Sequence, residues 1–449
     1  MLLAFPGKSP ARRGRAENMG EYLTGRLSAS SWFLSALAIA VCIAACGGGS
    51  SVRPWVTVKP AASVEDQPIQ IRVRGLSPHE VVSLELVSTD ARGVRWVSRA
   101  RFAASPSGVI DLARAAPGSG AYRGVWPMGL VSMMRPVGRA PAGAYFWAGN
   151  RPMRFKLTAR HGSNALASTT FTRRFSATTL ATTSQSLSKD GFVGQFTYPA
   201  GARRRPAIVV LSGSGGGLPG PLTSAPLAGR GYAVLALGYF KLPGLPQQLL
   251  RIPLEYFEHA LEWLHRQPQV DPNHVAVLGI SRGSEAALLS GAYFPKLVNA
   301  VIGMVPSDVA ICSYPGCRGA AWTFHGHAVP FTSEFATPEP VDHPNALIPV
   351  QRIHGPIFLA CGTADAVWPS CAFGRAIISH LDRVHDRFSH VLYTYAGAGH
   401  GVGEFIPYEP IVRSSSEVVL GGTVQADQRA RAQDWPRLLD FLATFSRGT

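Results

Sequence analysis

Apolar and polar residues alternate in short steps between Val52 and Ala177. Runs such as 69–73, 82–86 and 155–159 carry apolar side chains at every second position, and Gly, Pro, Ser and Asp separate the runs. A period of two is that of a strand with one buried face. Short strands divided by turn residues at this spacing predict an antiparallel β-sandwich over residues 56–177.

The pattern changes after a polar stretch rich in threonine and serine, which we predict to be a linker over residues 178–190. Beyond it, continuous apolar runs of strand length occur at 207–211, 233–237, 275–278, 300–305, 356–360 and 391–395. Helical patterns occur at 245–267 and at 427–445, where Pro436 is expected to kink or divide the helix. Alternating strands and helices predict an α/β domain over residues 191–449, with a mostly parallel sheet covered on both faces.

The N-terminus has the features of an export signal. Basic residues precede an apolar run at 32–43 that is too short to span a membrane. The run ends in Ile43-Ala44-Ala45-Cys46, which resembles a bacterial lipoprotein signal, where the cysteine becomes the lipidated first residue of the mature chain. We therefore predict a signal peptide at 1–46, a flexible tether at 47–55, and an exported lipoprotein anchored to a membrane of the bacterial cell envelope through Cys46. A plain secretory signal is the alternative.

The four cysteines beyond the predicted signal peptide agree with export. Cys312 and Cys317 lie close in sequence, as do Cys361 and Cys371, and disulfides persist in oxidising compartments. We predict the bridges Cys312–Cys317 and Cys361–Cys371. Neither pair has the spacing of zinc ligands and no histidine cluster accompanies them, so we expect no metal site.

The formal net charge of +16 does not by itself indicate a nucleic-acid partner. The basic residues are scattered, and the densest run, Arg203–Arg205, lies beside turn residues. Nucleic-acid binding calls for a basic stripe interleaved with aromatic residues, which we do not find. We interpret the charge as an arginine-rich exported surface.

The sequence Gly279-Ile280-Ser281-Arg282-Gly283 joins an apolar strand to a small-residue helical run. A nucleophile elbow places a serine on such a strand-to-helix turn and needs glycines where strand and helix approach closely. The alternative is an ordinary corner flanked by glycines. Because a serine hydroxyl is a poor nucleophile, the first reading requires a base and a residue that orients the base.

Two later strands end in residues suited to these roles. Asp365 follows the apolar run 356–360, and His400 follows the run 391–395. In a parallel sheet, the ends of these strands meet at one edge. The order serine, acid, histidine is that of the α/β-hydrolases. We therefore predict a catalytic triad of Ser281, Asp365 and His400.

An oxyanion hole should accompany the triad, because backbone N–H groups can hold the charge of an acyl-transfer intermediate. One donor would be the N–H of Arg282. The other would come from the glycine-rich loop at 212–217, from Ser214 or Gly215, and the sequence does not choose between them. A phosphate-binding loop is disfavoured because the lysine of a P-loop is missing. Glu285, one helical turn after Ser281, is expected to be a hydrogen-bonding residue and not a second acid.

Residues 56–445 resemble the acyl-CoA thioester hydrolase / bile acid-CoA:amino acid N-acyltransferase family. The resemblance lies in segments 73–76, 108–112, 122–130 (YRGVWPMGL), 214–218, 230–236, 279–285 (GISRGSE), 367–370 (VWPS) and 397–400 (GAGH). It implies a β-sandwich before an α/β-hydrolase domain, a triad at Ser281, Asp365 and His400, and no cofactor. Some acyltransferases of the family carry cysteine as nucleophile, and the serine found here resembles the hydrolytic members.

The first hypothesis for function is a serine acyl-hydrolase, most like an acyl-CoA thioesterase, acting on a small-molecule acyl ester or thioester. A second is a carboxylesterase or acyltransferase acting at the cell envelope, where CoA thioesters are scarce. A third is a non-catalytic lipoprotein that binds acyl chains.

Overall fold

The computed structural model describes residues 53–138, 144–147, 151–201, 203–334, 344–412 and 419–447. Residues Ser51–Thr449 form one compact unit. The predicted signal peptide, the lipidation site Cys46 and most of the predicted tether lie outside the described residues. No described helix combines the length and the apolar character needed to cross a membrane.

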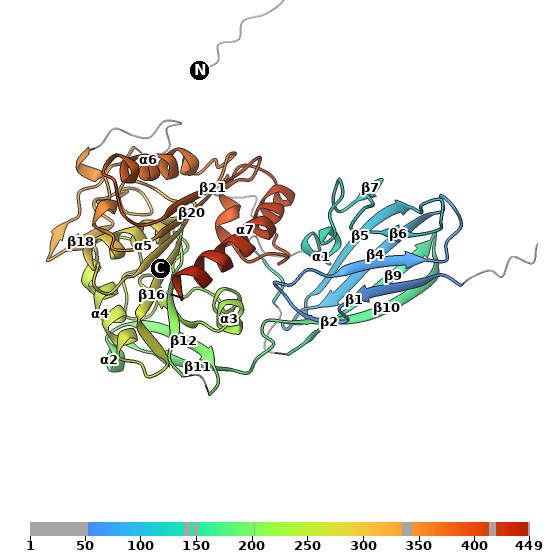
Figure 1. Cartoon of the computed structure of the whole chain (residues 1–449), viewed down its shortest axis with the longest axis horizontal. Coiled ribbons are helices and arrows are strands. Elements are labelled where there is room, and N and C mark those ends of the chain that lie inside the picture. The colour runs from blue at the N-terminus through green and yellow to red at the C-terminus, as the bar shows by residue number, and fades with distance from the viewer. Residues whose placement is uncertain are drawn as a thin grey trace, which may run out of the picture. The chain divides into compact units, whose positions relative to one another are not determined.

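The first part of this unit is a β-sandwich (Figure 1). One sheet has the order β1-β3-β6, and the other has the order β2-β10-β9-β4-β5-β7, with β8 added beside β5. All pairs are antiparallel except β2 with β10. The bounds are β1 Trp55–Lys59, β2 Ala62–Val64, β3 Gln70–Arg74, β4 Val81–Thr89, β5 Arg95–Ala103, β6 Ile110–Asp111, β7 Ser119–Gly120, α1 Gly129–Ser132, β8 Arg135–Pro136, β9 Met153–His161 and β10 Asn164–Arg174.

The sandwich follows from the alternating pattern in the sequence. Strands β4 and β5 bury every second residue, including Leu84, Leu86, Trp96 and Phe102, and leave the residues between them partly or fully exposed. The buried side chains of both sheets pack into one core. The predicted antiparallel domain is confirmed.

The second part contains an eight-stranded sheet with the order β11-β12-β14-β13-β16-β17-β20-β21. Strands β11 and β12 are antiparallel to their neighbours, and the remaining strands are parallel. The bounds are β11 Leu180–Gln185, β12 Val193–Pro199, β13 Arg205–Leu211, β14 Ala233–Gly238, β16 Val270–Ile280, β17 Ala300–Met304, β20 Ile357–Gly362 and β21 His390–Tyr395. A small sheet of β15 Ile252–Pro253, β18 Trp322–Phe324 and β19 His327–Ala328 lies apart from it.

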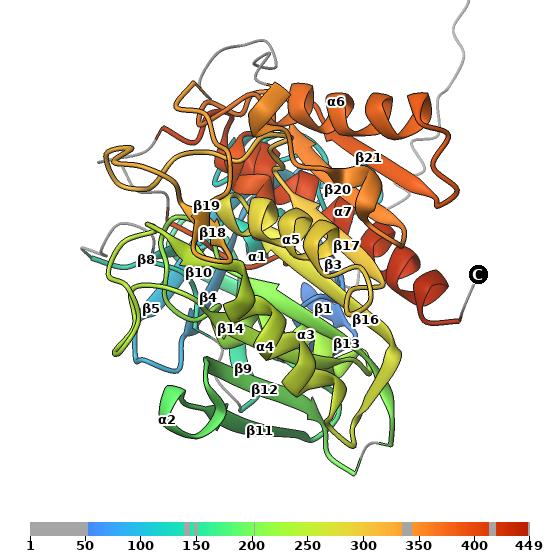
Figure 2. The ribbon, with the colours of Figure 1, turned by 90° about the vertical axis from the view of Figure 1, so that its left-hand side faces the viewer.

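Helices cover both faces of the large sheet, which is why its central strands are continuously apolar. Helices α4, α5 and α6 pack with one set of strand side chains, and α3 and α7 pack with the alternate set. Figure 2 views the sheet through α4 and α5. The bounds are α2 Leu187–Asp190, α3 Pro221–Gly229, α4 Leu254–His265, α5 Arg282–Tyr293, α6 Ser370–Arg383 and α7 Val424–Phe445. The predicted α/β fold is confirmed.

The predicted linker was wrong for most of its length. Residues Leu180–Gln185 form strand β11, which pairs along its whole length with β12 at the edge of the large sheet. Five of its six residues are exposed or only partly buried, so the polar side chains of an edge strand hid it from a search for apolar periodicity.

Two helices differ from their predicted limits. The pattern at 245–267 predicted one helix, but α4 begins only at Leu254, because Pro253 has an extended backbone and Arg251 has φ 52°. The apolar residue Ile252 is buried instead by pairing with Trp322. Helix α7 starts at Val424 and continues through Pro436 without dividing.

Candidate active site

The structure brings Ser281, Asp365 and His400 together at one edge of the large sheet. Each residue follows the carboxyl end of a different parallel strand: Ser281 follows β16, Asp365 follows β20 and His400 follows β21. Strands β16 and β20 both pair with β17, and β21 pairs with β20. The side chains can therefore converge although they are far apart in the sequence.

Ser281 lies on a strained turn. Its backbone has φ 58° and ψ −120°, which is unusual for a residue with a side chain. The two glycines are required by close backbone contacts: a Cβ on Gly279 would lie 1.8 Å from the Gly283 carbonyl oxygen, and a Cβ on Gly283 would lie 2.5 Å from the Leu211 oxygen. The backbone N–H of Ser281 is held by the Met304 carbonyl at 2.9 Å. This is the geometry of a nucleophile elbow.

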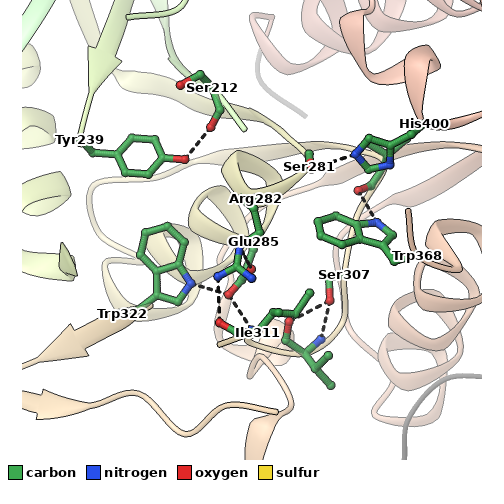
Figure 3. A network of polar contacts seen from close by, with 12 residues as sticks. Ser212, Tyr239, Ser281, Arg282, Glu285, Ser307, Ile311, Trp322, Trp368 and His400 are labelled. Carbon is green, nitrogen blue, oxygen red and sulfur yellow. Dashed lines mark hydrogen bonds and ion pairs between the residues drawn. The ribbon is translucent and has the colours of Figure 1, made fainter. Parts of the chain in front are cut away.

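His400 contacts both partners through opposite ring nitrogens. Its Nε2 lies 2.9 Å from the Ser281 hydroxyl, and its Nδ1 lies 2.9 Å from Asp365 Oδ2. When Nδ1 carries the proton and donates it to the carboxylate, Nε2 is free to accept the serine proton. Figure 3 shows the His400 imidazole facing Ser281. The side chain of Asp365 is only 2 % exposed, so little water competes for this contact.

Asp365 is fixed by residues that sequence reasoning did not assign a role. The backbone N–H of Val367 donates to Asp365 Oδ1 at 2.9 Å, and the Ser370 hydroxyl donates to Oδ2 at 2.6 Å. The indole ring of Trp368 packs edge-on against His400, with centroids 5.2 Å apart, and its N–H donates to the Val305 carbonyl. The segment 367–370 was recognised in the sequence only as a family resemblance. Its contacts show that it orients the acid and the imidazole.

The glycine-rich loop after β13 lies over the serine. Gly213, which the sequence did not single out, is packed against it, since a Cβ there would lie 3.1 Å from Ser281 Cβ and 3.6 Å from its hydroxyl. Ser214 and Gly215 follow in the same loop, and both line a cavity that also contains Ser281. Arg282 is the first residue of α5, so its N–H has no acceptor within the helix. Gly213, Ser214, Gly215 and Arg282 all line the cavity that contains Ser281.

A buried ion pair supports the start of α5. Arg282 Nε lies 3.1 Å from Glu285 Oε2, and both side chains are almost fully buried. The backbone N–H of Ile311 donates to Glu285 Oε1 at 2.9 Å, and the indole N–H of Trp322 donates to the same Oε1 atom. Burial raises the pKa of Glu285 and lowers that of Arg282, while each partner's charge opposes the shift of the other. Glu285 therefore acts as the hydrogen-bonding residue expected from the sequence (Figure 3).

A cavity of about 800 Å³ opens in front of Ser281. Apolar side chains predominate in its lining, and examples are Leu218, Ile280, Ile311, Trp368, Ile406 and Leu420. A cavity of this size and character suits an acyl chain. Among the residues that the structure describes, no group of His, Cys, Asp and Glu side chains is arranged to hold a metal ion.

One residue of the lining comes from the N-terminal part of the chain. Tyr145 lines the cavity, and its hydroxyl lies near Gly220, where a Cβ would be 3.9 Å away. Its backbone pairs with Ile411, and the guanidinium of Arg92 lies over its ring at 5.1 Å. Sequence analysis missed Tyr145 because no local pattern indicates a contact between segments so far apart.

Both predicted disulfides are present in the structure. Cys312 and Cys317 close a loop that lines the cavity, with an S–S distance of 2.13 Å. Cys361 at the end of β20 is joined to Cys371 at the start of α6, with an S–S distance of 2.04 Å. Asp365 lies between these last two residues, so the second bridge closes the loop that holds it.

Two regions of the chain match the profiles of known protein families. Residues 66–184 match the profile described as "Acyl-CoA thioester hydrolase/BAAT N-terminal region", and residues 252–446 match "BAAT / Acyl-CoA thioester hydrolase C terminal". Mouse (Mus musculus) acyl-coenzyme A thioesterase 6 is 30% identical over 421 residues, covering 88% of this chain and 97% of the relative.

Two further proteins are similar to this chain. Rat (Rattus norvegicus) acyl-coenzyme A amino acid N-acyltransferase 2 is 29% identical over 408 residues, covering 85% of this chain and 96% of the relative. A solved structure of a putative dienelactone hydrolase from Klebsiella pneumoniae is 16% identical, with a TM-score of 0.41, and covers 59% of this chain and 99% of its own. Together the two matched regions and the near full-length relatives show that the chain belongs to the BAAT / acyl-CoA thioester hydrolase family.

Proposed function

We propose that this protein is a serine acyl-hydrolase that cleaves acyl thioesters of the acyl-CoA class through Ser281, His400 and Asp365. The observation that carries the proposal is the continuous contact from the Ser281 hydroxyl through His400 to Asp365, with 2.9 Å at each step. These contacts allow His400 to take the proton of the Ser281 hydroxyl, which makes that oxygen nucleophilic. The apolar cavity beside it provides space for the acyl group of a substrate.

In the first half-reaction the Ser281 oxygen attacks the thioester carbonyl while His400 Nε2 takes the hydroxyl proton. The negative charge on the carbonyl oxygen is held by the N–H of Arg282 and by an N–H of the glycine-rich loop, from Ser214 or Gly215. Collapse of this intermediate breaks the carbon–sulfur bond, and His400 gives its proton to the departing sulfur. The products are a free thiol and an acyl group esterified to Ser281.

In the second half-reaction water takes the place of the thiol. His400 removes a proton from the water, the hydroxide attacks the acyl-serine, and His400 returns the proton to the serine oxygen. The fatty acid leaves and the enzyme is restored. Asp365 stays ionised and stabilises the imidazolium that forms in each half-reaction.

Acyl transfer to another acceptor is the second candidate, and a relative named as an N-acyltransferase favours it. An amine or alcohol would then attack the acyl-serine in place of water. Product analysis with and without added amines and alcohols separates the two outcomes. If the natural substrate is an ester of the cell envelope, kcat/KM for that ester should exceed kcat/KM for acyl-CoA in the same assays.

The site of action is proposed to be the cell envelope, with the chain anchored through Cys46 after removal of residues 1–45. The apolar run at 32–43 and the following Cys46 support this proposal. Cys46→Ala is expected to abolish incorporation of labelled fatty acid into the protein. Unchanged incorporation of the label in that variant would contradict lipidation at Cys46.

Replacement of the nucleophile tests the proposed reaction. Ser281→Ala is expected to lower turnover of acyl-CoAs or aryl esters by roughly two to four orders of magnitude, and to abolish labelling by a fluorophosphonate. Ser290→Ala is the control, because that serine lies in α5, the helix that begins directly after Ser281, and its hydroxyl donates to the Ala286 carbonyl. Equal activity of the two variants would reject Ser281 as the nucleophile, and absence of turnover and labelling in the wild type would favour the acyl-binding lipoprotein.

A further inference from the structure

One surface of the sandwich is strongly basic. Fourteen residues of strands β4, β5 and β9 alternate with the core residues and lie on the opposite face of the sheet, and all of them except the buried Thr158 are exposed or partly buried: Val81, Ser83, Glu85, Val87, Thr89, Arg95, Val97, Arg99, Arg101, Ala103, Arg154, Lys156, Thr158 and Arg160. Six of the fourteen are arginine or lysine, whereas 43 Lys and Arg among 449 residues would place about one there. We call this surface the basic face.

Strand pairing places these cations side by side. Ser83 lies opposite both Arg101 and Arg160, and Val87 lies opposite Val97 and Lys156. Neighbouring strands are only about 5 Å apart, so the positive charges cover one continuous area of the sheet. The three strands are adjacent in Figure 1.

The charge of the basic face is poorly neutralised. Glu85 is the one carboxylate among the outward positions, and it pairs with Arg99 at 2.5 Å and with Arg160 at 3.8 Å. Arg95, Arg101, Arg154 and Lys156 have no carboxylate within ion-pair distance among the described residues. Because like charges on one face repel one another, this arrangement is best suited to a negatively charged partner.

The other outward residues favour a lipid surface over a nucleic acid. Proteins that bind single strands stack bases on aromatic side chains, and none of the fourteen residues is aromatic. The remaining residues are small, polar or apolar, and Val81 and Val97 can approach the interfacial region of a bilayer. Clustered arginines and lysines are the usual means by which proteins recognise anionic lipid headgroups.

The position of the basic face in the chain agrees with this partner. It belongs to the domain that directly follows the apolar run 32–43 and the predicted lipid anchor at Cys46. Cys46 and Trp55 are nine positions apart and can be separated by at most about 30 Å, so an anchored chain would keep the sandwich close to the membrane. We propose that the basic face binds the anionic headgroups of a membrane surface. This inference is independent of the proposed catalytic function.

The experiment measures vesicle binding by the unit 51–449, which contains the sandwich and the α/β part but lacks the apolar run at 32–43. Vesicles of phosphatidylcholine with and without phosphatidylglycerol are sedimented with the protein at several salt concentrations. The test variant carries Arg101→Gln, Arg154→Gln and Lys156→Gln. The matched control carries Arg203→Gln, Arg204→Gln and Arg205→Gln, which remove the same charge from the densest basic run of the sequence.

We expect binding only to the anionic vesicles, with loss of binding as salt rises. Each cation near an anionic surface contributes about fivefold to binding, so the test variant should bind about 100-fold more weakly. The control should bind within about threefold of the wild-type unit. Both triple variants should keep ester hydrolysis, which shows that they are folded.

Three results would overturn the proposal. Equal loss of binding in both triple variants would show that only net charge matters. Equal binding to neutral and anionic vesicles would show that the headgroup charge is not recognised. Tighter binding to RNA or DNA than to anionic vesicles, lost in the test variant alone, would assign the basic face to nucleic acid.

Discussion

Tyr145 and Ile411 pair as an isolated antiparallel bridge, although 266 residues separate them in the sequence. The flanking backbone strengthens the contact: the Phe146 N–H donates to the Pro410 carbonyl at 2.9 Å, and the Val412 N–H donates to the Ala144 carbonyl at 2.7 Å. Because Tyr145 and Ile411 both line the cavity in front of Ser281, a segment from the N-terminal part of the chain forms part of the wall.

This wall predicts a role for Tyr145 in substrate selection. Tyr145→Ala removes an aromatic ring from the lining, so KM for short acyl substrates should rise about tenfold while bulkier acyl groups are accepted better. The value of kcat should change less than KM, since the ring does not contact the triad. Tyr145→Phe keeps the ring and should behave like the wild type. The measurement is kcat and KM over a series of acyl chain lengths.

A second contact between the same two parts of the chain provides the control. Gln425 exchanges two hydrogen bonds of 2.9 Å with the backbone of Arg123 and does not line the cavity. Gln425→Ala should loosen the contact without altering the chain-length profile. If both variants change the profile alike, the effect of Tyr145 comes from the packing of the two parts and not from the cavity wall.

Asp365 gives a second prediction. Asp365→Asn keeps the shape of the side chain but presents an amide to Nδ1 of His400, which favours the wrong tautomer of the imidazole. The expected loss in kcat is about 10⁴-fold with little change in KM. The chain contains a matched control in Asp386, which contacts His390 at 3.1 Å far from Ser281 in sequence and at the opposite end of β21. Asp386→Asn should leave kcat unchanged, and a similar loss in both variants would reject the assigned role.

The sequence alone was sufficient to predict those elements whose structure is determined by residues close to them in the chain. The strands at 207–211 and 275–278 are recognisable because a buried parallel strand must be apolar throughout, and Ser281 because the elbow requires Gly279 and Gly283. Asp365 and His400 could be found because parallel strands bring their carboxyl ends to one edge. The order of residues along the chain was then sufficient to assemble the site.

The parts that were missed depend on contacts between distant segments. Strand β11 has the polar composition of a linker, and only its pairing with β12 makes it a strand. The beginning of α4 is set by the pairing of Ile252 with Trp322, which no periodicity within 245–267 reveals. Tyr145 and the donors to Asp365 likewise owe their roles to the folded chain, so sequence periodicity and motif spacing could not assign them.

Asp434 predicts a pH dependence of stability. Burial raises its pKa to about 7 from an ordinary value near 4, against the opposing effects of the Tyr395 hydroxyl, which donates to it at 2.6 Å, and of Arg437. Between these two values the folded protein binds a proton that the unfolded chain releases, so this group makes stability fall as pH rises from about 4 to 7. The contribution is then constant above pH 7.

The measurement compares wild type with Asp434→Asn, whose amide oxygen can still accept from Tyr395 but cannot titrate. The difference in Tm between the two proteins should change steadily from pH 5 to pH 7 in favour of the variant, and level off above pH 7. Comparing the two proteins at each pH removes the effect of the large net charge, which they nearly share. A difference that is the same at every pH would show that Asp434 does not bind the proton.

The buried pair of Arg282 and Glu285 gives the last prediction. Glu285→Ala leaves the Arg282 charge buried without its partner and frees the Ile311 backbone, so the free energy of unfolding should fall by about 3–5 kcal/mol. The double variant Arg282→Leu, Glu285→Leu removes both charges and should recover most of that loss. Because the proposed oxyanion site uses only the backbone N–H of residue 282, the double variant should also keep measurable turnover. The exposed pair of Glu262 and Arg266, 3.8 Å apart, is the control, and Glu262→Ala should cost less than about 0.5 kcal/mol. Denaturant unfolding of the four proteins checks the prediction, and equal stability of Glu285→Ala and Glu262→Ala would contradict it.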